Sequence, residues 1–214
     1  MNEIIIIDYG LGNLKSIKNA FKYLNIPARI TTNSEQLNDS THIILPGVGA
    51  FKDGMNGIRD ANFINPLKAA ASEGKIILGI CLGMQMLLTE SHEFGIHKGL
   101  GLIKGTVKPF KPVQQDNNYR FKVPHVGWNN FIKINNLNNS PFLDIVEKEQ
   151  MYFVHSFYCD AKSNKNVLAT TQYGLQEFHS IINKDNIYGC QFHPERSGKK
   201  GLNILKNFAL TNKK

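Results

Sequence analysis

The stretch that most constrains this chain is Lys75–Gln85, in which a glycine lies two residues before and two residues after Cys81. The apolar residues Ile76 to Ile80 predict a short strand, and Leu82 to Ser91 predict an amphipathic helix. A strand, a crowded turn with small neighbours and a helix make the nucleophile-elbow pattern, here with cysteine in place of serine. The N–H groups and the dipole at the start of that helix favour a thiolate, which is the nucleophilic form of cysteine.

A buried core cysteine is the alternative interpretation, because a lone cysteine after an apolar strand usually packs as a small hydrophobe. Cys81, Cys159 and Cys190 are an odd number, far apart, and none has zinc-ligand spacing. We therefore expect no disulfide framework, no metal site and a reducing compartment. No apolar run reaches the length of a membrane span, and the run Ile4–Ile7 lacks a basic leader, so we expect a soluble cytoplasmic protein and no membrane partner.

The N-terminal part of the chain alternates between predicted strands and helices. Strands are expected at Glu3–Asp8, Ala28–Thr31, His42–Leu45 and before Cys81, with helical segments ending near Leu24, starting at Ser34, and spanning Phe51–Asp60 and Phe63–Glu73. Gly10 and Gly12 resemble the start of a dinucleotide fingerprint, but its third glycine is missing, so a tight strand-to-helix turn is favoured. This order predicts a parallel, doubly wound sheet that binds ligands beyond the carboxyl ends of its strands.

The pattern changes after Gly95, where short alternating runs indicate antiparallel or mixed strands. The expected strands are Thr106–Phe110, Arg120–Val123, His125–Ile134, Met151–Cys159, Val167–Thr171, Ser180–Asn183 and Ile187–Gln191, followed by a helix at about Lys199–Ala209. The predicted fold class is therefore α/β, a flavodoxin-like doubly wound mixed sheet with a parallel N-terminal half and an antiparallel C-terminal extension. Because neither an internal repeat nor a linker is visible, residues 1–214 are predicted to form a single domain.

The chain carries a net charge of +8 and has a pI near 9.3. Its lysines are scattered, and it contains neither a zinc-finger nor an RNP signature, so nucleic-acid binding is not expected. A solvated basic face explains the charge best, ahead of a face for an anionic partner or a phosphorylated substrate.

Two further motifs could complete a catalytic site around Cys81. His193 and Glu195 lie two residues apart around Pro194, so on extended backbone their side chains share a face and the carboxylate can orient the imidazole. The glycines on either side of Val48 could let backbone N–H groups stabilise an oxyanion. Taken alone, the first motif fits a surface turn better, and the second fits a plain strand-to-helix turn better.

Together, Gly79–Gln85, Pro46–Gly49 and His193–Glu195 resemble the motifs of class I (triad) glutamine amidotransferases. A narrower resemblance, covering essentially the whole chain, is to the glutaminase subunits of imidazole glycerol phosphate synthases. The residues that carry it are Asp8–Gly10, Asn13, Pro46–Phe51, Gly79–Gln85, Pro124–Asn129, Tyr152–Ser156 and Gln191–Gly198.

The resemblance implies a role for each matching residue. Cys81 would attack the side-chain amide of glutamine, His193 would act as general base and then acid, and Glu195 would orient His193. Val48 and Leu82 would supply the oxyanion N–H groups. The implied substrate-binding residues are Gly49, Gln85, Glu93, Ser156 and Phe157, of which Phe157 is more often tyrosine in the family. The implied partner-interface residues are Asn13, Trp128 and Tyr152.

The family further implies a (β/α)8-barrel cyclase as the heterodimer partner and no cofactor. Ammonia would pass to that partner, which makes imidazole glycerol phosphate and an aminoimidazole carboxamide ribotide in histidine biosynthesis. Glutaminase activity would be weak until the partner is loaded.

Three alternatives remain beside this hypothesis. A paralogous glutaminase subunit could supply ammonia to a synthase of surface-sugar biosynthesis, and it would carry similar motifs. A catalytically silent regulatory subunit would have lost one of Cys81, His193 and Glu195, yet all three are present. A redox-sensing, flavodoxin-like cysteine protein would leave His193 and Glu195 without a role.

Overall fold

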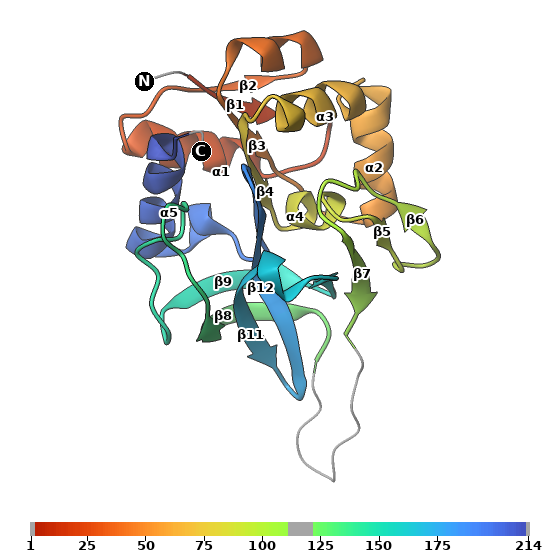
Figure 1. Cartoon of the computed structure of the whole chain (residues 1–214), viewed down its shortest axis with the longest axis vertical. Coiled ribbons are helices and arrows are strands. Elements are labelled where there is room, and N and C mark those ends of the chain that lie inside the picture. The colour runs from red at the N-terminus through yellow and green to blue at the C-terminus, as the bar shows by residue number, and fades with distance from the viewer. Residues whose placement is uncertain (1–2, 111–121, 213–214) are drawn as a thin grey trace.

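The structure, a computed structural model, describes residues 3–110 and 122–212 (Figure 1). Its strands are β1 Ile4–Ile7, β2 Ala28–Thr31, β3 His42–Leu45, β4 Ile76–Ile80, β5 Glu90–Ser91, β6 His97–Lys98, β7 Gly105–Pro109, β8 His125–Ile134, β9 Gln150–His155, β10 Phe157–Ala161, β11 Val167–Tyr173, β12 Gln176–Lys184 and β13 Ile187–Cys190. Its α-helices are α1 Leu14–Tyr23, α2 Phe51–Asp60, α3 Ile64–Ser72, α4 Leu82–Met86 and α5 Gly198–Leu210, and its 3₁₀ turns are η1 Ser34–Asp39, η2 Asn164–Asn166 and η3 Pro194–Arg196.

The parallel part of the sheet runs in the order β2-β1-β3-β4-β13. The last of these strands comes from the far end of the chain and pairs in parallel with β4, with Cys190 opposite Ile80. The amide of Cys81 then donates to the carbonyl of Cys190 at 2.8 Å. This pairing brings the residues after β13 next to the turn after β4, at the carboxyl edge of the sheet where parallel strands bind ligands.

The antiparallel part continues from β13 through β12, β10 and β7. A branch of the same sheet pairs β12 with β11, β11 with β8, and β8 with β9. Figure 1 shows β8, β9 and β11 gathered below the parallel strands. The predicted fold class, a mixed α/β sheet with a parallel N-terminal half and an antiparallel extension, is confirmed.

Alternate side chains of the central strands enter two separate cores. Ile4 and Ile6 of β1 pack on the side covered by α1 and α5, whereas Ile5 and Ile7 pack on the side covered by α2 and α3. All four isoleucines are at most 1% exposed. A strand buried on both faces lies inside the sheet, which is why this run is apolar without a break.

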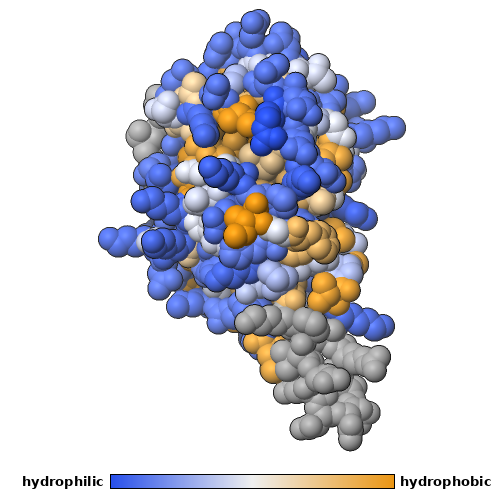
Figure 2. Space-filling view, turned by 90° about the vertical axis from the view of Figure 1, so that its right-hand side faces the viewer, coloured by the Kyte–Doolittle hydropathy of each residue, from blue (hydrophilic) through white to orange (hydrophobic). Residues whose placement is uncertain are grey.

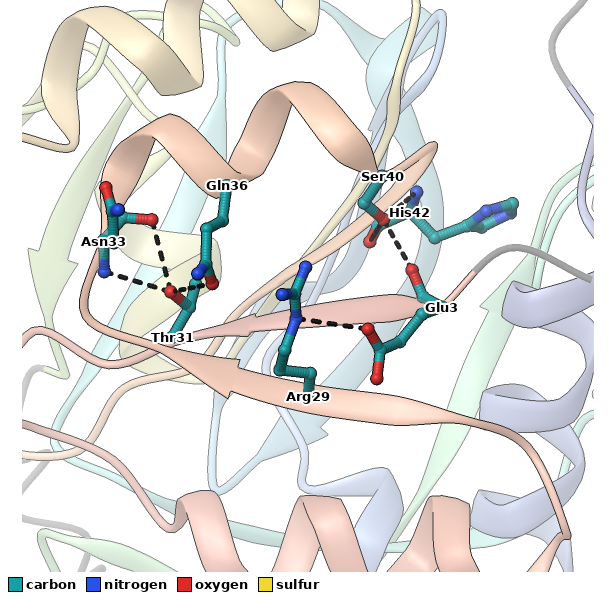
Figure 3. Close-up of polar contacts among 7 residues, drawn as sticks. All are labelled: Glu3, Arg29, Thr31, Asn33, Gln36, Ser40 and His42. Atoms are coloured by element: carbon teal, nitrogen blue, oxygen red, sulfur yellow. Dashed lines mark hydrogen bonds and ion pairs between the residues drawn. The ribbon is translucent and has the colours of Figure 1, made fainter.

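The connection from β2 to β3 runs through η1, and hydrogen bonds hold both of its ends (Figure 3). The Thr31 hydroxyl donates to Gln36 Oε1 at 2.7 Å and accepts from the amide of Asn33 at 3.0 Å. At the other end of the connection, Ser40 Oγ donates to the carbonyl of Glu3 at 2.8 Å. These bonds satisfy backbone groups of the turn and fix where β3 enters the sheet.

The predicted helix Leu82–Ser91 was too long, because α4 ends at Met86. A later segment of the chain packs on the end of this helix. The amide of Leu100 donates to the carbonyl of Met86 at 2.9 Å, and the amide of Gly101 donates to the carbonyl of Leu88 at 3.0 Å. These bonds occupy carbonyls that a longer helix would use for its own amides.

Two strand predictions also need correction. Met151–Cys159 is not one strand but β9 and β10, separated at Ser156, because β9 pairs with β8 whereas β10 pairs with β7 and β12. Of the predicted strand Arg120–Val123, Arg120 and Phe121 lie outside the described residues, and Lys122 and Val123 are not in a strand.

Candidate active site

Cys81 lies at the apex of a strained turn between β4 and α4. Its φ and ψ angles are 54° and −110°, a conformation that L-residues rarely adopt. The glycines around it are required by close backbone contacts. A Cβ atom on Gly83 would lie 1.8 Å from the carbonyl oxygen of Leu45, and one on Gly79 would lie 2.8 Å from the backbone of Gly83. The predicted elbow is therefore formed, and it presents Cys81 at the carboxyl edge of the sheet.

The loop that carries Val48 packs beside the elbow. A Cβ atom on Gly47 would lie 2.8 Å from Leu82 Cβ, so the loop and the start of α4 are in contact. Tyr9 Oη donates to the carbonyl of Pro46 at 2.7 Å, and burial raises the pKa of Tyr9 far above its usual value, so the phenol stays a donor. This hydrogen bond from Tyr9 thus holds the start of the loop in place.

Glu93 holds the other end of this loop. Glu93 is 9% exposed, and its carboxylate accepts a hydrogen bond from the amide of Phe51, the first residue of α2, at 2.5 Å. Burial raises the pKa of Glu93, and the bond from Phe51 opposes that rise. A carboxylate at a helix N-terminus is stabilised by the helix dipole. Glu93 is therefore placed to anchor the Val48 loop as well as to line the site.

His193 and Glu195 form a buried pair in and before η3. His193 Nδ1 lies 2.9 Å from Glu195 Oε1, and the two side chains are 4% and 0% exposed. The backbone of His193 is held on both sides: its amide donates to the carbonyl of Tyr152 at 2.9 Å, and its carbonyl accepts from Ser197 Oγ at 2.6 Å. The structure thus brings the imidazole and the carboxylate, which the spacing predicted to share a face, into direct contact.

The protonation of His193 depends on both of its neighbours. Burial lowers the pKa of His193, but its interactions with Cys81 and Glu195 outweigh burial and raise the pKa to about 10. Nε2 is buried and has no partner with full hydrogen-bond geometry among the described residues, so its interaction with the Cys81 thiol is looser than the Glu195 bond. The imidazolium form is accordingly favoured near neutral pH, and proton transfer within this group is coupled.

A cavity of about 620 Å³ opens in front of Cys81. Its lining includes Cys81, Val48 and Leu82 together with all five predicted substrate-binding residues, namely Gly49, Gln85, Glu93, Ser156 and Phe157. His193 and Glu195 are not part of the lining. The structure therefore gathers the predicted nucleophile, oxyanion residues and substrate residues around one cavity, with the imidazole–carboxylate pair beside it.

Apolar side chains line the cavity mouth and the adjoining surface. Figure 2 views the face that carries α2 and β5 to β7, where orange patches interrupt an otherwise hydrophilic surface. Phe94 and Ile96, between β5 and β6, are 89% and 75% exposed, and the Phe94 ring meets Phe157 edge-on at 5.9 Å between centroids. Val48 is also exposed at the cavity.

One residue that contacts the site, Gln191, had no role assigned to it from the sequence. Gln85 Nε2 donates to the carbonyl of Phe157 at 3.0 Å and to Gln191 Oε1 at 3.2 Å, and Gln191 Nε2 donates to Cys81 Sγ at 3.7 Å. The one signal in the sequence that could have found Gln191 is its position two residues before His193, since alternate residues of an extended segment share a face.

His125 and His155 form a hydrogen-bonded pair at the wall of the cavity. His155 Nδ1 lies 2.8 Å from the carbonyl of Phe157, and His155 Nε2 lies 3.0 Å from His125 Nδ1. Because the carbonyl can only accept, His155 is protonated on Nδ1 and accepts at Nε2 from His125. Burial lowers the pKa of His125 to about 4 and that of His155 to about 3, so both rings are neutral. His155 also lines the cavity.

Two of the three predicted interface residues are paired with each other. Trp128 and Tyr152 are opposite each other in the β8–β9 pair, and their rings meet edge-on at 6.1 Å between centroids. The guanidinium of Arg196 lies over the Tyr152 ring at 4.7 Å, which links this aromatic pair to η3. Asn13 is placed separately, at the N-cap of α1.

Among residues 3–110 and 122–212, no group of three or more His, Cys, Asp and Glu side chains is arranged to hold a metal ion. In the same part of the chain, no helix has both the length and the apolar character to span a membrane.

Known proteins resemble this chain over nearly its whole length. The family model described as "Glutamine amidotransferase class-I" matches residues 5–212. A protein named imidazole glycerol phosphate synthase subunit HisH 1, from Legionella pneumophila strain Lens, is 43% identical over 97% of this chain and 99% of its own length. The HisH subunit of Geobacter metallireducens is 42% identical over 99% of both chains.

Solved structures support the fold alone. The structure of PurLQS from Thermotoga maritima matches with a TM-score of 0.72 and 22% identity, over 97% of this chain and 98% of that one. With the family model matching nearly its whole length, the chain belongs to the class-I glutamine amidotransferase family.

Proposed function

We propose that this chain is the glutaminase subunit of an imidazole glycerol phosphate synthase. It hydrolyses the side-chain amide of glutamine and delivers ammonia to a synthase partner in histidine biosynthesis. Relatives named HisH that are 43% and 42% identical over nearly the whole chain support this function. The observation that carries the chemistry is the buried His193–Glu195 pair beside Cys81 at the cavity wall. The alternative pairing with a surface-sugar synthase is not favoured.

The first half of the reaction is acylation of Cys81. The Cys81 thiolate attacks the amide carbon of glutamine, and the carbonyl oxygen becomes an oxyanion between the N–H groups of Val48 and Leu82. One such donor is typically worth about 3 kcal/mol to the transition state. The contact between the Val48 loop and the start of α4 supports this placement.

Release of ammonia follows from the change in charge at the sulfur. Once the sulfur is bonded to carbon it carries no negative charge, so one of the interactions that raise the pKa of His193 is lost while burial still lowers it. The imidazolium therefore gives its proton to the leaving nitrogen as the C–N bond breaks. Ammonia leaves, and a glutamyl thioester on Cys81 remains.

The second half of the reaction is hydrolysis of the thioester. Neutral His193 takes a proton from water, the resulting hydroxide attacks the thioester carbon, and the C–S bond breaks. Glutamate leaves, and the thiolate–imidazolium pair is restored. Glu195 holds Nδ1 of His193 throughout, so that Nε2 faces the reacting atoms.

The five cavity residues Gly49, Gln85, Glu93, Ser156 and Phe157 hold the substrate glutamine in this proposal. The (β/α)8-barrel cyclase binds over the carboxyl edge of the sheet at Asn13, Trp128 and Tyr152, which keeps ammonia from water, where it would be protonated. Residues 1–214 act as one domain, a view supported by the single sheet through all described parts. The three free, buried cysteines support a reducing cytoplasm as the compartment.

The test is a coupled assay with the barrel cyclase from the same organism, its ribonucleotide substrate and amide-labelled glutamine. Label should enter imidazole glycerol phosphate, and the labelling rate should fall by roughly three or more orders of magnitude with Cys81→Ala. If glutamine hydrolysis is stimulated only by a different synthase, the proposed glutaminase chemistry still stands, but the assignment to histidine biosynthesis is rejected. Unchanged labelling with Cys81→Ala would reject the nucleophile.

A further inference from the structure

A chain of side-chain amides ends on the sulfur of Cys81. Gln85 Nε2 lies between the carbonyl of Phe157 at 3.0 Å and Gln191 Oε1 at 3.2 Å. Gln191 Nε2 lies 3.7 Å from Cys81 Sγ. Gln191 is fully buried and Gln85 is 5% exposed, so solvent does not compete for these groups.

The direction of every bond in this chain is fixed by the Phe157 carbonyl. A carbonyl oxygen can only accept, so Gln85 must present its NH₂ group to Phe157. The same NH₂ group faces Gln191, which must therefore present its oxygen to Gln85 and its own NH₂ group to the sulfur. Turning the Gln191 amide over would set two donors against each other in a buried place, at a cost of about 1–3 kcal/mol. A donor is consequently locked toward Cys81.

Such a donor distinguishes the two forms of the sulfur. A thiolate accepts hydrogen bonds far more strongly than a thiol, because the acceptor is charged. The thiol, by contrast, donates to the carbonyl of Val154 at 3.8 Å. The Val154 carbonyl thus favours the protonated form, and the Gln191 N–H opposes it.

We propose that Gln191 is a positioning residue that directs a side-chain N–H at Cys81 and favours its thiolate form, a role that rests on Cys81 being the nucleophile of the proposed function. Gln191 does not line the cavity, so it acts through Cys81 rather than on the substrate. The titratable groups that influence or surround Cys81 are His193 and Glu195 near η3, Tyr9 after β1, Cys159 in β10 and Cys190 in β13. Unlike these groups, the side-chain amide of Gln191 does not titrate, so it remains a donor to Cys81 at every pH.

The experiment measures alkylation of Cys81 by iodoacetamide as a function of pH, with the full chain and without glutamine. Gln191→Met keeps the length of the side chain and removes the donor. We expect the midpoint of the alkylation profile to rise by about one pH unit and the rate at pH 7 to fall about tenfold, equivalent to about 1.4 kcal/mol. The plateau rate at high pH should stay near that of the unaltered chain. Cys81→Ala identifies the labelled site.

Matched variants separate this role from a general effect of losing an amide. Gln172→Met makes the same chemical change at an exposed position of β11 and should leave the profile where it was. In the glutaminase assay with the partner, Gln191→Met should lower kcat with little change in the KM for glutamine. An alkylation midpoint within experimental error of the unaltered chain, with Gln191→Met folded, would overturn the proposal.

A second measurement needs no change at Gln191. The side-chain amide signals of Gln191 in an NMR titration should move with the ionisation of Cys81, and that movement should vanish in Cys81→Ala. If the Gln191 amide signals do not shift as Cys81 ionises, the proposal is overturned, even if Gln191→Met does not fold. Neither the alkylation profile nor the NMR titration requires glutamine. If only the proposed function fails, both measurements still give the expected result, but the chain releases no ammonia from glutamine.

Discussion

At the scale of single residues, the Glu195 carboxylate controls the orientation and the charge of His193. Glu195→Gln removes the charge and can place an NH₂ group where Nδ1–H should donate, which favours the wrong tautomer. We expect kcat to fall roughly 10²- to 10⁴-fold, in the range known for triad carboxylates, with a small change in the KM for glutamine. Steady-state kinetics with the partner present would check this, and a loss confined to KM would contradict it.

The same substitution has a pH-dependent effect on stability. The pKa of His193 rises from 6.5 to about 10 on folding, so its protonated form stabilises the fold fully below pH 6.5, and this stabilisation is lost as pH rises toward 10. Because Glu195 is one cause of that rise, Glu195→Gln should destabilise most at pH 6 and hardly at all at pH 10. Urea denaturation of both proteins at pH 6, 8 and 10 measures the difference, and an equal difference at all three values would contradict the assignment.

At this scale the sequence identifies residues whose neighbours are local. Cys81 is marked by Gly79 and Gly83, and the His193–Glu195 pair by a spacing of two residues around Pro194. The contact of Gln191 with Cys81 joins positions 110 residues apart and exists only because β13 pairs with β4. No local pattern encodes such a contact.

At the scale of elements, the elbow depends on β3 and α4 packing with no side chain between them. A Cβ atom on Gly83 would lie 1.8 Å from the carbonyl oxygen of Leu45, so Gly83→Ala must push β3 and α4 apart. We expect a loss of at least about 4 kcal/mol of stability, or failure to fold, because the obstacle is backbone that cannot rotate away. Denaturant unfolding of the purified chain measures the loss.

Gly101→Ala is the matched control for that prediction. Gly101 has open space around its Cβ direction but a φ of +70°, so alanine there meets strain without a clash. A cost of about 1–2 kcal/mol is expected, the usual cost of a left-handed conformation. Gly83 has no positive φ, so equal losses for Gly83→Ala and Gly101→Ala would show that the contact with Leu45 costs less than its geometry indicates.

The element boundaries that could not be predicted from the sequence are set by contacts with residues far away in the chain. The pattern after Cys81 is helical in periodicity, yet α4 stops at Met86 because the amides of Leu100 and Gly101 take carbonyls at its end. The break at Ser156 likewise follows from β9 and β10 having different partners. In contrast, the β1 strand and the α2 and α5 helices agree with their predicted bounds to within one or two residues, because their patterns are strong and local.

At the scale of the whole molecule, the parallel order of β1 to β4 follows from alternating strands and helices, but the insertion of β13 beside β4 does not. That insertion is what creates the site, since it places His193 and Glu195 beside Cys81. It also puts the cavity, the apolar surface near it and the Trp128–Tyr152 pair at one edge of the sheet. The opposite edge holds the C-terminal end of α5, where Thr211 accepts from His42 at the start of β3.

These two edges allow a matched test of where the cyclase docks. Trp128 and Leu210 are both 53% exposed, but Leu210 lies at the end of α5, on the edge away from the site. Trp128→Lys introduces a charge that must be desolvated in the proposed interface, so we expect at least a tenfold weaker association with the cyclase and a matching loss of labelled product at limiting cyclase. Leu210→Lys should change neither quantity. Isothermal titration with the purified cyclase measures the affinity, and a stronger effect of Leu210→Lys than of Trp128→Lys would place the interface on the other edge and leave the open cavity without the cover that ammonia transfer requires.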